Sequence, residues 1–259
     1  MKTQRPQNNQ HPLGISAAAA LVACSTALGL SVAVSSASLI NDGSFDSGAI
    51  TGLYNTGTTP AGGVLSNGAA ASPYTLVSAP SPQGTSLSVY SSAGGYPGAD
   101  WVPPGSYSAW IAPVADSAYT NSPQTYGLPG AYVFQTTFNS TSAGSITISG
   151  NWATDNSSNS MQINSDGAVS ITPTSGFGAF SAFTITGNII AGSNTFDFYV
   201  TNGTTLSHTD GANPTGLRVE FAGVNVVPLP VPAPGPLALI GGLALAGGLV
   251  LRRRMAQKA

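Results

Sequence analysis

Charge is scarce in this chain of 259 residues and unevenly distributed. Only seven residues are Lys or Arg, and six of them lie within the first five or the last eight residues. Arg218 is therefore the one base between residues 38 and 236, while all nine acids fall in that span, which gives it a net charge of about −8. Because nucleic-acid binding depends on Lys and Arg that neutralise phosphates, we expect no nucleic-acid partner.

Cysteine and histidine are nearly absent. Cys24 is the single cysteine, so no disulfide within the chain contributes to stability. Two histidines are too few for an ordinary catalytic zinc site. A Ser-His-Asp hydrolase would depend on His208, which lies in a loop rich in Ser, Thr and Asp and is not accompanied by a Gly-x-Ser-x-Gly motif.

A glycosidase would need two carboxylates that face each other across a substrate. The candidates are Asp155, Asp197, Asp210 and Glu220. Nothing in their spacing pairs them. We therefore predict that the protein is not an enzyme and keep an unrecognised hydrolase only as an alternative.

The N-terminal segment has the features of an export signal. Lys2 and Arg5 are basic, residues 13–34 are apolar and rich in alanine, and Ser35-Ser36-Ala37 offers small residues to signal peptidase. We predict a signal helix in residues 1–37 with a cut after Ala37. Leu21-Val22-Ala23-Cys24 resembles a lipobox, so lipidation at Cys24 is the competing possibility.

The C-terminal tail has three parts. Prolines between residues 227 and 236 predict an extended, polyproline-like stem that does not join a sheet, because proline fixes φ and lacks an N–H. Residues 237–251 carry no charge and predict a transmembrane helix, which at 15 residues would be short for a bilayer. Arg252, Arg253 and Arg254, within residues 252–259, would keep that end in the cytoplasm and leave the body outside.

This three-part tail resembles the PEP-CTERM sorting signal of Gram-negative bacteria. The matching residues are Val227, Pro228, Leu229, Pro230, Pro232, Ala233 and Pro234. Leu229 or Ala233 stands where the usual signal has glutamate. The resemblance implies recognition by an exosortase-type membrane protease that cuts near the prolines, whereas a plain membrane tail would remain uncut.

Residues 38–226 predict one all-β domain. Six segments alternate between apolar and polar residues, as strands with one face on a core do. They are residues 131–138, 145–152, 160–164, 180–185, 194–201 and 216–227. In the first half, two or three strands are expected near residues 64–65, 74–77 and 87–90. Tight turns are expected at residues 165–167, 186–188, 202–203 and 210–211, where Gly and Asx residues gather.

Short motifs in this body resemble bacterial jelly-roll modules of the galactose-binding-like kind. One is the opening Leu39-Ile40-Asn41-Asp42-Gly43-Ser44-Phe45-Asp46, and others are residues 148–156, 161–164, 192–200 and 213–220. The resemblance implies an antiparallel β-sandwich of the jelly-roll type. The expected architecture is this sandwich between the N-terminal signal helix and the C-terminal sorting tail, residues 227–259.

Calcium is the only metal that the composition favours, because loop oxygens and carboxylates suit Ca²⁺ in an acidic extracellular domain. Asp42 and Glu220 are the candidate ligands, since the terminal strands of a sandwich commonly run side by side. The alternative is that Asp42 shapes the first turn and that Glu220 pairs with Arg218 or solvent. No other cofactor is expected.

Aromatic residues cluster between residues 96 and 132, where they could stack on sugar rings. They are Tyr96, Trp101, Tyr107, Trp110, Tyr119, Tyr126 and Tyr132. The structural alternative is that several of them, Trp101 and Trp110 first, belong to the core. The sequence thus predicts an exported bacterial protein that is held at the membrane by its tail and serves adhesion or structure in the envelope or extracellular polysaccharide matrix, with a carbohydrate-binding module as the alternative.

Overall fold

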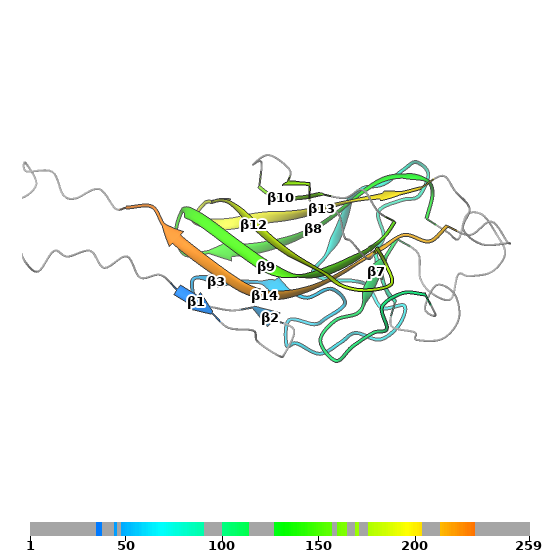
Figure 1. Ribbon diagram of the computed structural model, residues 1–259, viewed down its shortest axis with the longest axis horizontal. Coiled ribbons are helices and arrows are strands. Elements are labelled where there is room, and N and C mark those ends of the chain that lie inside the picture. The colour runs from blue at the N-terminus through cyan, green and yellow to red at the C-terminus, as the bar shows by residue number, and fades with distance from the viewer. Residues whose placement is uncertain are drawn as a thin grey trace, which may run out of the picture. The chain divides into compact units, whose positions relative to one another are not determined.

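The structure is a computed structural model, and it describes residues 35–37, 44–45, 48–90, 100–113, 127–156, 160–164, 169–170, 176–203 and 213–230. All of these belong to one unit, Val34–Ala259. Within them the regular secondary structure consists of β-strands, which form two six-stranded sheets and a two-stranded pair, all antiparallel where paired (Figure 1). The all-β antiparallel prediction is confirmed for these residues.

Sheet 1 has the strand order β12-β9-β14-β7-β6, and β1 also pairs with β14. Its strands are β1 (Ser35–Ala37), β6 (Ser88–Tyr90), β7 (Trp110–Ala112), β9 (Gly144–Asp155), β12 (Ser181–Ile189) and β14 (Gly216–Pro228). Sheet 2 has the order β11-β10-β13-β8-β3, and β5 also pairs with β8. Its strands are β3 (Ile50–Thr51), β5 (Thr75–Ser78), β8 (Gly130–Ser140), β10 (Ser160–Ile163), β11 (Val169–Ser170) and β13 (Gly192–Asn202). β2 (Ser44–Phe45) pairs with β4 (Leu53–Tyr54).

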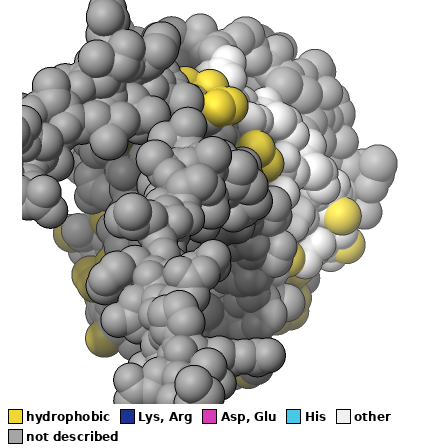
Figure 2. Space-filling view, turned by 90° about the vertical axis from the view of Figure 1, so that its left-hand side faces the viewer, with side chains coloured by type: hydrophobic (Ala, Val, Ile, Leu, Met, Phe, Trp, Pro, Cys, Tyr) yellow, Lys and Arg dark blue, Asp and Glu magenta, His cyan; other side chains and the backbone are white. Residues whose placement is uncertain are grey.

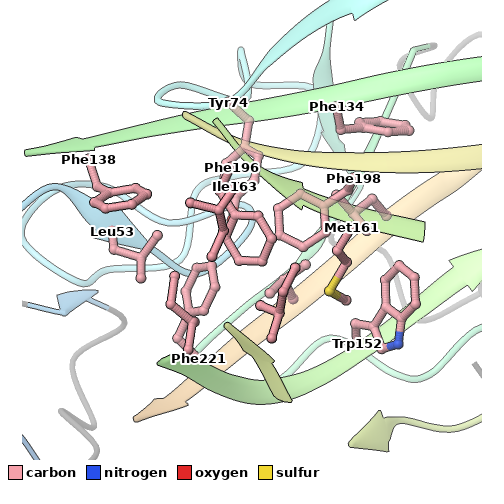
Figure 3. Packing of buried hydrophobic residues seen from close by; sticks show 14 of the residues in the cluster. Leu53, Tyr74, Phe134, Phe138, Trp152, Met161, Ile163, Phe196, Phe198 and Phe221 are labelled. Carbon is pink, nitrogen blue, oxygen red and sulfur yellow. The ribbon is translucent and has the colours of Figure 1, made fainter. Parts of the chain in front are cut away.

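The inner faces of the two sheets enclose an aromatic core (Figure 3). Phe196 and Phe198 of sheet 2 stack at 4.4 Å between ring centroids, and Phe196 also meets Phe221 of sheet 1 at 6.0 Å. Trp152 of sheet 1 contacts Phe198 in the same way. Contacts of this kind across the two layers establish a sandwich, and rings that bury 150–250 Å² each supply much of its hydrophobic stabilisation.

The six strands predicted in the second half are confirmed as β8, β9, β10, β12, β13 and β14, mostly one to four residues longer than predicted. Alternation also predicted their faces correctly, because Ile146, Ile148 and Phe198 are all fully buried in the core. In the first half, β5 and β6 lie where two of the three strands were expected. Residues 64–65 form no strand, although Val64 makes one isolated bridge to Thr58.

The turn predicted at residues 186–188 is wrong, since these residues continue β12. Gly187 serves packing instead. A Cβ built there would lie 2.9 Å from the Cβ of Ile163 in β10, so the close approach of the two sheets requires a residue without a side chain. The chain turns a few residues later, between Ile189 and Gly192.

The predicted stem also begins later than expected, because β14 includes Pro228, which pairs with Gly144 of β9. Proline is tolerated at the end of a strand, where the ladder no longer needs its missing N–H. The next residue still contacts the sandwich, since Leu229 N–H donates to the carbonyl of Ala143 at 2.9 Å. The stem residues Pro232, Ala233 and Pro234 lie outside the described residues, as does the predicted span at residues 237–251.

Candidate functional site

A loop, residues 100–108, covers the outer face of sheet 1 and builds a second, smaller core there. Trp110 and Ala112 of β7 point away from the main core, and Trp101 of the loop packs on them. The Trp101 ring lies 4.3 Å from Trp110 and 5.3 Å from Tyr90, and both tryptophans are buried. The structural alternative for these two residues is confirmed, and neither is available to stack on a sugar.

Arg218 fastens this loop to the sheet. It projects from β14, and its side chain is 2% exposed. Its Nε donates to Ser108 Oγ at 2.7 Å, and its Nη1 donates to the carbonyl oxygens of Val102, at 3.1 Å, and Pro103. The guanidinium also lies 4.8 Å from the ring centroid of Phe180, a cation–π contact. A guanidinium offers five donors in a fixed plane, so one side chain holds both ends of the loop.

Glu220 completes this network. Its Oε1 accepts from Arg218 Nη2 at 3.2 Å and from Ser108 Oγ at 2.6 Å. Burial lowers the pKa of Arg218, and the charge of Glu220 acts in the opposite direction. The pairing of Glu220 with Arg218 that the sequence offered as the alternative to calcium is therefore observed.

The calcium prediction stays a prediction. The cation beside Glu220 offsets the negative charge that a Ca²⁺ site would use, and Asp42 lies outside the described residues. Within the part of the chain that the structure describes, no three His, Cys, Asp or Glu residues lie close enough together to hold a metal ion.

A second polar network is centred on Asp155 at the end of β9. Its side chain is buried, and its Oδ2 accepts from Trp101 Nε1 at 2.8 Å while its Oδ1 accepts from Asn156 Nδ2 at 2.5 Å. Burial raises the pKa of Asp155 to about 7, the hydrogen bond from Trp101 lowers it, and the nearby charge of Asp100 raises it further. Asp155 thus joins the outer loop to the end of sheet 1, and its contribution to the free energy of folding depends on pH.

This network reaches the end of sheet 2, because Gly203 N–H donates to Asn156 Oδ1 at 2.8 Å, and two buried asparagines continue it there. Asn202 Nδ2, at the end of β13, donates to the carbonyl oxygens of Gly127 at 2.8 Å and Asn213 at 3.1 Å. Asn213 Nδ2 in turn donates to the carbonyl of Gly203. The side-chain oxygens of Asn202 and Asn213 are buried and accept no hydrogen bond from the described residues. These amides join the chain segments that converge at this end of the sandwich.

The carboxylates considered for hydrolysis are dispersed. Asp155 lies at the end of β9, Glu220 faces the outer loop, and Asp197 accepts from Gln135 Nε2 at 2.8 Å on sheet 2. Each has its own polar partners, so these three form no acid–base pair. Asp210 and His208 lie outside the described residues.

Exposed aromatic side chains occur in the outer loop and beside it. Tyr107 is 44% exposed and Phe177 is 37% exposed. Phe177 lies next to the loop because its carbonyl accepts from Val102 N–H at 2.8 Å. Tyr132 is buried, and Tyr96, Tyr119 and Tyr126 lie outside the described residues. Of the aromatics predicted for sugar stacking, Tyr107 remains a candidate; Phe177 was missed because no motif or local cluster marks it.

The sorting residues that the structure describes are accessible. Val227 is 45% exposed and Leu229 is 64% exposed, and the chain from Val227 to Pro230 leaves sheet 1 at the end where β9 begins. Arg252, Arg253 and Arg254 lie outside the described residues. No helix among the described residues is long and apolar enough to span a membrane.

Comparisons with known proteins assign the chain to no family. No family model and no curated protein matches the sequence. Among solved structures, a family 35 carbohydrate binding module from Clostridium thermocellum is similar at 13% identity and a TM-score of 0.30, over 55% of this chain and 88% of the module. A CBM35 from Paenibacillus barcinonensis is similar at 15% identity and a TM-score of 0.30, over 57% of this chain and 93% of that one.

A third similar structure is the module CBM6cm-2 from Cellvibrio mixtus lichenase 5A in complex with cellotriose. It shares 15% identity at a TM-score of 0.27, over 47% of this chain and 79% of the module. The sandwich described here is established by its own strand pairing and core, and these similarities add nothing to the assignment of a ligand.

Proposed function

We propose that the protein is an exported bacterial surface protein, held at the inner membrane by its C-terminal tail, cut by an exosortase-type protease, and used for adhesion or structure in the envelope or polysaccharide matrix. One observation supports this most. Ser35 of β1 pairs with Val226 of β14, so the N-terminal and C-terminal segments leave the sandwich at the same end (Figure 1). An anchored protein would then present its opposite end, with the Asp155 network, away from the membrane.

The surface at the end where the C-terminal tail leaves the sandwich agrees with this orientation. Figure 2 views that end, and the described side chains visible there are hydrophobic or uncharged. Exposed apolar residues at this end are Ile190, which follows β12, Val227 and Leu229. Six residues separate Pro230 from Leu237, and as a polyproline-like stem they would hold this end within about 20 Å of the predicted span.

The sorting hypothesis is tested by intact-protein mass spectra of cell-bound and secreted material. We expect secreted protein that ends between Pro228 and Pro236. Changing the three arginines together to glutamine should reduce this product, because the helix loses its cytoplasmic anchor; Lys258→Gln is the matched control. Secreted protein that retains Arg252–Ala259 would contradict exosortase cleavage.

A second candidate function, binding of an extracellular polysaccharide, is favoured by the exposed rings of Tyr107, in the outer loop, and Phe177, beside it. If a sugar stacks there, Tyr107→Ala and Phe177→Ala should each weaken binding about tenfold, and Val77→Ala, at an exposed position of sheet 2, should leave it unchanged. Affinity electrophoresis in gels that contain the producing strain's polysaccharide measures this. Equal mobility with and without the polysaccharide would leave adhesion or structure as the function.

A further inference from the structure

The predicted export signal contains two sites that signal peptidase could cut, and the sequence alone does not show which of them is used. Signal peptidase requires small residues before the cut. Ser35-Ser36-Ala37 meets that requirement, and so does Ser31-Val32-Ala33 four residues earlier. The two cuts differ in one respect that concerns the fold, because only the earlier one leaves β1 in the mature protein.

β1 covers one part of an edge of β14, and the other parts of that edge have partners of their own. Along the edge of β14 that faces away from β9, Leu217 pairs with Ile111 of β7. Farther along, Val219 N–H donates to Thr56 Oγ1 at 2.9 Å, and Phe221 N–H donates to Asn55 Oδ1 at 2.8 Å. The remaining stretch, Val224–Val226, pairs with β1.

Loss of β1 would open that stretch. Among the described residues, β1 alone pairs with Val224, Asn225 and Val226 on this edge. An uncovered edge presents free N–H and C=O groups that recruit other strands, a hazard that folded proteins avoid. β1 belongs to the same compact unit as the sandwich.

We propose that signal peptidase cuts after Ala33, so that the mature protein begins at Val34 and β1 remains as its first strand. This inference rests on the proposed export of the protein. It replaces a cut after Ala37, which would divide a paired strand from the sheet that it closes.

N-terminal sequencing of the exported full-length protein, made in a Gram-negative host, tests this. We expect Val34 as the first residue. Ala33→Phe should abolish that product, because a bulky residue cannot precede the cut, whereas Ala37→Phe should leave it unchanged. A first residue of Ser38 or Cys24 would overturn the inference while leaving export intact. An uncut Met1 would overturn the inference and contradict export as well.

Discussion

Replacing Arg218 with methionine is expected to lower the free energy of unfolding by about 3 kcal/mol or more, because it removes the buried partner of an ion pair and leaves several acceptors without a donor. The side chain is 2% exposed and holds the loop through Ser108, Val102 and Pro103. Methionine keeps about the length of the aliphatic part of the arginine side chain and lacks its donors. Urea unfolding at neutral pH measures the loss.

The same variant should release the outer loop before the sandwich unfolds. Trp101 and Trp110 then become more accessible to water, and the tryptophan fluorescence of the folded protein shifts to longer wavelength. Glu220→Gln is the matched control, since its amide oxygen can still accept from Ser108 and Arg218, and we expect it to cost about 1 kcal/mol. An Arg218→Met protein as stable as the control would show that the guanidinium does not hold the loop.

Replacing Asp155 with asparagine is expected to remove most of a pH dependence of stability between about pH 4 and pH 7. Folding raises the pKa of Asp155 from the ordinary 3.8 to about 7, so in this range the folded state binds more protons than the unfolded state. Stability therefore falls as the pH rises through the range. The full change corresponds to about 4 kcal/mol, of which the substitution recovers a part at pH 8.

Urea unfolding from pH 4 to pH 8 measures this slope. The variant recovers only a part of the stability at pH 8 because Asn156 and Trp101 both donate to the native carboxylate. An amide at position 155 places its own N–H₂ group near one of these two donors. Asp197→Asn is the comparison: burial also raises the pKa of Asp197, which makes its hydrogen bond on sheet 2, so this variant should leave the Asp155 part of the slope in place. Equal slopes for wild type and Asp155→Asn would contradict the assignment.

Local pattern was enough to predict the strands that carry the core. Alternation marks the buried face of β9 and β13 because one face of each strand lies against the opposite sheet. The local pattern gave a wrong prediction where a residue is required by a contact with a distant part of the chain. Gly187 has the appearance of a turn residue, yet the nearby Ile163 is what requires it.

The outer network was only partly predictable. Scarcity of charge singled out Arg218, and the pairing of Glu220 with Arg218 or solvent was predicted as the alternative to calcium. Its hydrogen bonds to Val102 and Ser108 span more than 100 residues of sequence, and no local signal encodes them. The same holds for Asp155, whose pKa is raised by burial and which accepts from Trp101, 54 residues away in the sequence.

The place of β14 in sheet 1 has a mechanical consequence. This strand lies inside the sheet, and its C-terminal end continues directly into the tail. Tension applied to the tail would pull β14 along its own axis, while its hydrogen bonds to β9 run across that axis. The ladder would thus carry the load in shear, with many bonds resisting together.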